Sequence, residues 1–184
     1  MTTKSTFIDQ FITTLRDETL TPRADRARLR RDAGNTLAEA RHPDVFWSKL
    51  PPGMKEYDVD WYFLVATLFP LAPDYRDDES WYNFGQSLRA MRPTEKELQK
   101  GLDRRVGRLL DADDDQLPFL LRQLVQQLAQ KEVAVSWEQL LSDLTNWNHD
   151  KRFVQYNWAR AYFKGEAPEA DPTKTNQIET TQEN

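Results

Sequence analysis

Large apolar side chains recur at every third or fourth position along most of this chain, and that spacing constrains its fold more than any other feature. The first segment of this kind contains Phe7, Ile8, Phe11, Ile12 and Leu15. Residues at this spacing share one face of an α-helix, which can be buried against other helices. No segment alternates convincingly between apolar and polar residues, as a half-buried strand would. We therefore predict an all-α fold, a helical bundle of about nine helices in two packed lobes.

Breaks in the apolar pattern indicate how the chain is divided. Proline and glycine interrupt the pattern at several points. We predict an N-terminal helical lobe over residues 1–112 and a C-terminal helical lobe over residues 113–164. Residues 165–184 contain five acids, one lysine and a single large apolar side chain, Ile178. Such a segment cannot bury enough apolar surface to fold, so we predict a disordered acidic tail.

Two short patterns predict where helices begin. Thr94 is followed three residues later by Glu97, and Ser136 is followed at the same distance by Gln139. This spacing is typical of a capping box, in which the first side chain and the third helical residue bond each other's backbone N–H groups. We therefore expect helices to start at both places.

Residues that could support catalysis or bind metal are few. The absence of cysteine excludes disulfides, zinc ribbons, iron–sulfur clusters and thiol catalysis. His42 and His149 each stand alone beside an expected helix start, where a polar residue caps the helix. The acidic residues 111–115 lack the glycine and the distal glutamate of an EF-hand, so a solvated loop is favoured over a hydrolytic metal site. We predict no enzymatic activity, no catalytic residue, no metal and no cofactor.

The hydropathy of the chain bears on its location. Its most apolar stretch, residues 61–72, contains a proline and is too short to cross a bilayer. The first residues include Asp9 and lack the apolar core of a signal peptide. We expect a cytoplasmic protein with no membrane partner.

The six tryptophans admit two interpretations. Exposed indoles could stack on the bases of single-stranded nucleic acid. However, the tryptophans lie within apolar helical patterns, so we favour burial of most of them in the core. For Trp147 and Trp158 in particular we predict a structural role.

Positive charge is concentrated in two segments although the net charge of the chain is −5. Residues 23–31 contain five arginines and one aspartate, and residues 89–110 contain seven basic and three acidic residues. Arginine dominates both segments, and its planar guanidinium group suits phosphate. A charged helix face is more often simply solvated, so spacing alone leaves both a phosphate-binding surface and a solvated face open.

The second basic segment has its charges on one side of a predicted helix. Lys100, Arg104 and Arg108 lie within about 80° of one another on a helical wheel, and Arg105 extends the same arc. We call these four residues the basic ridge. The opposite side carries Leu98, Leu102, Val106 and Leu109, which we expect to pack against the core.

Several short motifs occur in a characteristic order along residues 5–163. They are Ala27-Arg28-Leu29-Arg30-Arg31, Phe84-Gly85-Gln86-Ser87-Leu88, Arg104-Arg105-Val106-Gly107-Arg108-Leu109-Leu110, Leu121-Arg122-Gln123-Leu124, Val135-Ser136-Trp137-Glu138-Gln139-Leu140-Leu141 and Trp158-Ala159-Arg160-Ala161-Tyr162-Phe163. In their order and spacing they resemble the CasB family, the small subunit of the type I-E CRISPR Cascade surveillance complex.

The resemblance implies an all-helical, non-catalytic protein that binds other Cascade subunits, guide RNA and further copies of itself. It also implies contact with single-stranded target or displaced DNA, whose sequence is read by base pairing with the guide. From the resemblance and the basic segments together, we predict a nucleic-acid-binding set of Arg28, Arg30, Arg31, Arg89, Arg92, Lys100, Arg104, Arg105, Arg108, Arg122, Lys131 and Arg152. The alternative is a helical protein-interaction module without a nucleic-acid role.

Overall fold

The computed structural model describes residues 4–54, 56–75 and 82–165. Over these ranges the protein contains nine α-helices, three 3₁₀-helices and no β-strand, which confirms the predicted all-α fold. The α-helices are α1 (Lys4–Arg16), α2 (Arg23–Arg31), α3 (Pro43–Trp47), α4 (Val59–Leu68), α5 (Phe84–Ala90), α6 (Lys96–Leu110), α7 (Leu117–Gln130), α8 (Trp137–Leu144) and α9 (Phe153–Lys164). The 3₁₀-helices are η1 (Leu37–Glu39), η2 (Glu56–Asp58) and η3 (Phe69–Leu71). Apart from Gly165, the predicted acidic tail lies outside the described residues.

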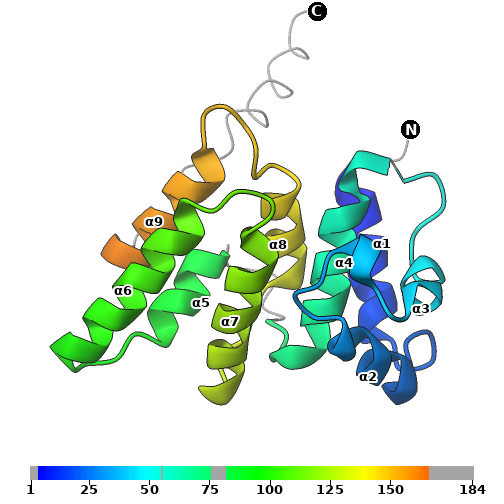
Figure 1. Ribbon diagram of the computed structural model, residues 1–184, viewed down its shortest axis with the longest axis horizontal. Coiled ribbons are helices and arrows are strands. Elements are labelled where there is room, and N and C mark those ends of the chain that lie inside the picture. Colours follow the sequence, from blue (N-terminus) through cyan, green and yellow to red (C-terminus); the bar gives the residue numbers. More distant parts are fainter. Residues whose placement is uncertain (1–3, 55, 76–81, 166–184) are drawn as a thin grey trace, which may run out of the picture.

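The helices form two groups that meet at α8. Helices α1 to α4 pack together on one side, and α5, α6, α7 and α9 pack together on the other (Figure 1). Helix α8 contacts α1 and α4 of the first group, and its Asp143 accepts a hydrogen bond from Trp158 of α9 in the second, so it joins the groups. Contacts of α5 and α6 with α7 and α9 cross the predicted lobe boundary at residue 112, and the division into lobes stays a prediction.

A single hydrophobic cluster runs through both groups, from Ile8 in α1 to Tyr162 in α9. At one end of it, the rings of Phe11 and Tyr62 lie 4.9 Å apart between centroids. At the other end, Trp147 and Trp158 lie 5.2 Å apart. Full burial of each such side chain stabilises a fold by a few kcal/mol, so the core holds α8 and α9 to the rest of the protein. Among the described helices, none is both long and apolar enough to cross a membrane.

The tryptophans mostly occupy this core, as predicted. Trp137, Trp147 and Trp158 are almost completely buried. Trp61 is partly buried against the cluster, whereas the side chain of Trp47 is 54% exposed. Trp81 lies outside the described residues.

Helices α5 and α9 approach each other closely at Gly85 of α5. A Cβ atom on Gly85 would lie 2.3 Å from the carbonyl oxygen of Trp158, which is well inside van der Waals contact. Glycine therefore allows α5 to approach α9 at a distance that a residue with a side chain would not permit.

The capping boxes predicted at Thr94 and Ser136 are wrong. Helix α6 begins one residue too late for Thr94 to cap it, because its N-cap residue is Glu95. Ser136 is the N-cap residue of α8, but its side chain makes no capping hydrogen bond. A capping box instead starts α5, where the backbone N–H of Gln86 donates to Asn83 Oδ1 at 3.1 Å and that of Asn83 donates to Gln86 Oε1 at 2.8 Å.

Arg16, at the end of α1, ties the two helix groups together. Its Nε donates to Asp74 Oδ2 at 2.6 Å, and its second amino group donates to Asp74 Oδ1 at 2.9 Å. It also bonds both carboxylate oxygens of Glu138 in α8. Hydrogen bonding to Asp74 is the main reason why the pKa of Arg16 is raised above its ordinary value. Arg16 therefore joins α1 to α8 through Glu138 and to the segment after η3 through Asp74, each by a charge-assisted pair.

Candidate nucleic-acid interface

Helix α2 presents most of its arginines to solvent. Leu29 is buried, whereas Arg28, Arg30 and Arg31 are exposed. In the described part of the chain, these three guanidinium groups make no hydrogen bond or ion pair with the protein. Their charges are therefore available to an external anion.

One side of α2 lines a surface pocket with four arginines. Arg23, Arg26 and Arg30 line it from α2, and Arg16 lines it from α1. Its other walls include Phe69 of η3 and, beyond η3, Asp74. We call this site the α2 pocket.

The arginines of the α2 pocket are held in different ways. Arg26 donates to the backbone carbonyl oxygens of Thr21 and Leu15 at 3.1 Å and of Arg16 at 2.8 Å, which fixes its guanidinium group. Arg16 is neutralised by its two carboxylate partners, whereas Arg23 and Arg30 are exposed and lack a partner in the described ranges. The pocket thus combines a fixed positive charge with two free guanidinium groups, an arrangement that suits phosphate oxygens.

The predicted set omitted three of these arginines, Arg16, Arg23 and Arg26. The sequence does carry a signal for two of them, because positions 23, 26 and 30 lie on one helix face. No sequence pattern places Arg16 beside them, since that contact depends on how α1 packs against α2.

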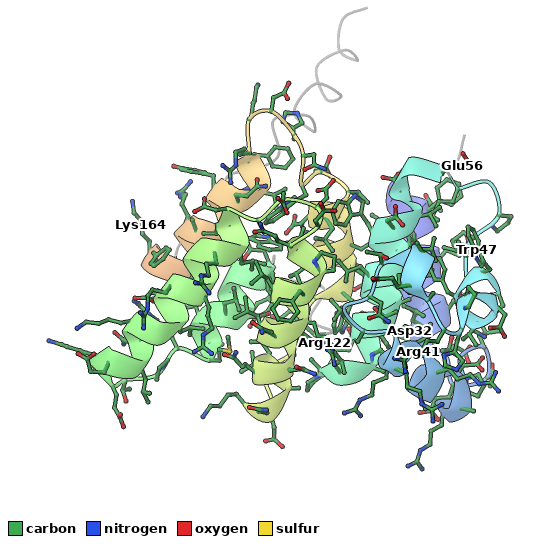
Figure 2. The ribbon with its side chains drawn as sticks, viewed as in Figure 1. Asp32, Arg41, Trp47, Glu56, Arg122 and Lys164 are labelled. Atoms are coloured by element: carbon green, nitrogen blue, oxygen red, sulfur yellow. The ribbon has the colours of Figure 1, made fainter. Side chains whose placement is uncertain are left out.

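Arg122 of α7 lies close to the end of α2. A Cβ atom on Gly34, which follows α2, would lie 2.7 Å from Cδ of Arg122. Gly34 has a φ of +82°, so glycine suits both the backbone and the close approach. Figure 2 shows Arg122 between α7 and the group formed by α1 to α4. The structure therefore brings Arg122 next to the C-terminal end of the helix that carries Arg28, Arg30 and Arg31.

The basic ridge, on α6, forms a second positively charged surface. All four of its residues are exposed, on the side opposite the buried Leu102, Val106 and Leu109. Lys100 pairs with Glu97 at 2.8 Å, and Arg105 Nε donates to the carbonyl oxygen of Gly101 at 3.2 Å. Arg104 and Arg108 make no such bond within the described ranges. Within the basic ridge, their guanidinium groups are therefore the most available to an external anion.

The prediction that Leu98 packs with the other α6 leucines is wrong. Its side chain is 57% exposed. It lies in the first turn of α6, which extends beyond the neighbouring helices (Figure 1). A helical wheel gives the direction of a side chain but not the length over which a neighbouring helix covers it.

Arg89 and Arg92 serve mainly as links between helices. Arg89 donates to the carbonyl oxygen of Tyr162 in α9 at 2.9 Å. Arg92 lies 3.4 Å from a carboxylate oxygen of Asp103 in α6, and its guanidinium carbon lies 5.3 Å from the centre of the Tyr162 ring. The hydroxyl of Tyr162 donates to Asp103 at 2.7 Å and completes the cluster. Both arginines are thus partly committed to holding α5, α6 and α9 together.

The remaining two predicted residues lie at helix ends. Lys131 is exposed after the last turn of α7. Arg152 precedes α9 in a left-handed conformation with a φ of 49°, and its guanidinium group donates to the carbonyl oxygen of Leu110 at 2.5 Å. Arg152 therefore connects the start of α9 to the end of α6 while staying more than half exposed.

The two histidines lie beside helix starts, but neither bonds a helix N–H group of α3 or α9. His42 is the N-cap residue of α3, and its Nδ1 lies 3.4 Å from Asp32 Oδ2. His149 Nδ1 accepts a hydrogen bond from the backbone N–H of Lys151 at 3.2 Å. Over the residues that the structure covers, no three histidine, aspartate or glutamate side chains gather into a potential metal-binding group.

Comparison with known proteins reveals one family. The profile of the family "CRISPR-associated protein Cse2" matches residues 25–163. A curated relative, the CRISPR-associated protein Cse2 of Thermus thermophilus, is 33% identical over 113 residues. That match spans 61% of this chain and 62% of the relative's length.

Several solved structures share the fold. The crystal structure of a Cse2 family protein from Thermus thermophilus matches with a TM-score of 0.68 and 27% identity, over 89% of this chain and 99% of that one. A chain of a CRISPR RNA-guided surveillance complex matches with a TM-score of 0.69, over 86% of this chain and 92% of that one. At 23% identity, this second likeness concerns the fold alone.

Proposed function

Because this chain belongs to the CRISPR-associated Cse2 family, we propose that it is a non-catalytic, nucleic-acid-binding subunit of a type I-E Cascade surveillance complex. In this role it supports the guide-RNA assembly and the displaced DNA strand of the R-loop. Its partners are other Cascade subunits, guide RNA, single-stranded DNA and further copies of itself, and it acts in the cytoplasm.

The observation that carries this proposal is the α2 pocket. Arg23 and Arg30 leave their guanidinium groups free, and Arg26 adds a charge that backbone carbonyls fix in place. Arginines that neutralise phosphates bind a strand with little dependence on its sequence. This matches a complex in which base pairing with the guide reads the sequence. Binding to the displaced strand would favour the open R-loop over the reannealed duplex.

A protein-interaction module without a nucleic-acid role is the second candidate. Its support is a pair of exposed apolar side chains, Trp47 and Leu20, which are 54% and 52% exposed. Lys49 joins the two segments by donating to the carbonyl oxygen of Leu20 at 2.6 Å. Tryptophan is enriched at protein interfaces, so the exposed ring of Trp47 suits contact with another protein.

Salt dependence of binding separates the two candidates. Wild-type protein and the double variant Arg23→Ala with Arg30→Ala are titrated with fluorescent single-stranded DNA at several salt concentrations. Loss of two phosphate contacts should flatten the slope of log affinity against log salt by about 1.4, at roughly 0.7 per contact. Lys151→Ala with Lys164→Ala removes the same charge from exposed positions near the two ends of α9 and should leave the slope closer to that of the wild type. Absence of DNA and RNA binding at low salt would favour the interaction module.

A further inference from the structure

Phe119, in the first turn of α7, is an aromatic side chain that the core does not use. Its side chain is 57% exposed, although neighbouring positions Leu117 and Leu121 are completely buried. Exposure of a single apolar residue is common and needs no explanation by itself. Phe119 differs from the other exposed apolar residues because it lines a surface pocket together with an arginine of the basic ridge.

Phe119 lines a surface pocket between the end of α6 and the start of α7. The same pocket is lined by Arg108 of the basic ridge, by Gln116 and by Leu120. Leu120 is partly buried against the hydrophobic core, which fixes the apolar floor beside Phe119. Arg108 has no protein partner in the described ranges and is free to bind an anion. An aromatic face, a free guanidinium group and a side-chain amide thus line one pocket.

The side chains that line this pocket carry one positive charge, on Arg108, and one negative charge, on Asp111. Its one carboxylate, Asp111, lies 3.9 Å from the guanidinium group of Arg152. Two neighbouring carboxylates accept hydrogen bonds from neutral donors and keep their charge: Asp113 accepts from the backbone N–H of Gln116 at 2.9 Å, and Asp114 accepts from the side chain of Asn148 at 2.8 Å. A ligand bound here would therefore gain more from the aromatic ring than from net charge.

We propose that Phe119 and Arg108 form a subsite for one nucleotide of a single strand, with its base stacked on Phe119 and its phosphate bound by Arg108. Base–aromatic stacking requires an unpaired base and tolerates any sequence. The subsite therefore makes the protein prefer single-stranded to double-stranded nucleic acid. It rests on the proposed function, because it lies beside the basic ridge and extends its phosphate contacts to a base.

The test compares Phe119→Ala, Phe119→Trp and Phe163→Ala in binding to single-stranded and double-stranded DNA across a salt series. Phe119→Ala should weaken single-strand binding by about five- to 140-fold, the usual effect of losing one stacked base. The salt slope should stay unchanged, because no charge is lost, and duplex binding should stay the same. Phe119→Trp should retain binding. Phe163→Ala removes another exposed aromatic, 46% exposed at the end of α9, and should have little effect.

A direct readout comes from photo-crosslinking of DNA that carries 5-bromodeoxyuridine. The subsite requires a crosslinked peptide containing Phe119, and this crosslink should disappear in Phe119→Ala. If the wild type binds single strands but Phe119→Ala binds equally well, the subsite is wrong while the proposed function stands. If the wild type binds neither DNA nor RNA at low salt, both the proposed function and the subsite are wrong.

Discussion

The indole N–H of Trp158 donates a hydrogen bond of 2.6 Å to Oδ2 of Asp143 inside the core. The other carboxylate oxygen accepts from Gln139 Nε2 at 2.8 Å. Both hydrogen bonds favour the charged carboxylate, but burial outweighs them and raises the pKa of Asp143 from its ordinary value of 3.8 to about 7. A residue that links α8 to α9 therefore changes charge near neutral pH.

This pKa shift predicts a pH-dependent stability. Folding takes up a proton at Asp143 between about pH 4 and pH 7, because the folded carboxyl binds its proton more tightly than the unfolded one. Its contribution to stability is complete below pH 4 and is lost as the pH rises through 7, by roughly 4 kcal/mol at most, since one pKa unit equals about 1.4 kcal/mol. Asp143→Asn cannot titrate and should lose this dependence.

The measurement is the melting temperature of wild type and Asp143→Asn at pH 5 and pH 8. Other titrating groups affect both proteins equally, so the difference between the two isolates Asp143. The wild type should lose more stability than Asp143→Asn on going to pH 8. Equal losses would mean that the carboxyl titrates in the fold as it does in the unfolded chain.

The fold could be predicted from the sequence because helical periodicity is a local property. The side-chain contacts that could not be predicted join residues far apart in the chain. Arg89 stands in a basic segment like Arg104, but only the packing of α5 on α9 brings its guanidinium group to the carbonyl oxygen of Tyr162. Similarly, nothing near Asp143 in the sequence indicates that Trp158 will cover it.

The two tryptophans of this region should be structural. Trp147 is 2% exposed and Trp158 is 1% exposed, and the indole N–H of Trp147 donates to the carbonyl oxygen of Ala112 at 3.1 Å. Replacing either by alanine leaves a large cavity and should destabilise the protein by about 3–5 kcal/mol. Urea unfolding measures this loss. A variant that unfolds like the wild type but no longer binds DNA would instead favour stacking on bases.

Gly85→Ala should destabilise the contact between α5 and α9. The new methyl group would lie 2.3 Å from the carbonyl oxygen of Trp158, so the two helices would have to separate. Overpacking of this kind typically costs about 1–3 kcal/mol. Gly107→Ala in α6 is a matched control, because apart from the nearby backbone of α6 and the two adjacent residues no atom lies within 4 Å of the added carbon. There the better helix propensity of alanine should stabilise by up to about 1 kcal/mol. Equal melting temperatures of the two variants would contradict the close approach at Gly85.

Arg104 and Arg108 should contribute phosphate contacts, whereas Arg92 should contribute stability. The first two are exposed and unpaired in the described ranges, on the side of α6 opposite the buried Leu102 and Leu109. Arg104→Ala with Arg108→Ala should therefore leave the melting temperature nearly unchanged and flatten the salt slope of single-strand binding by about 1.4, at roughly 0.7 per phosphate. Arg92→Ala removes the partner of Asp103 and the cation over Tyr162, so it should lower the melting temperature. An unchanged slope in the double variant would exclude the basic ridge from the binding surface, and the α2 pocket would then have to supply the phosphate contacts alone.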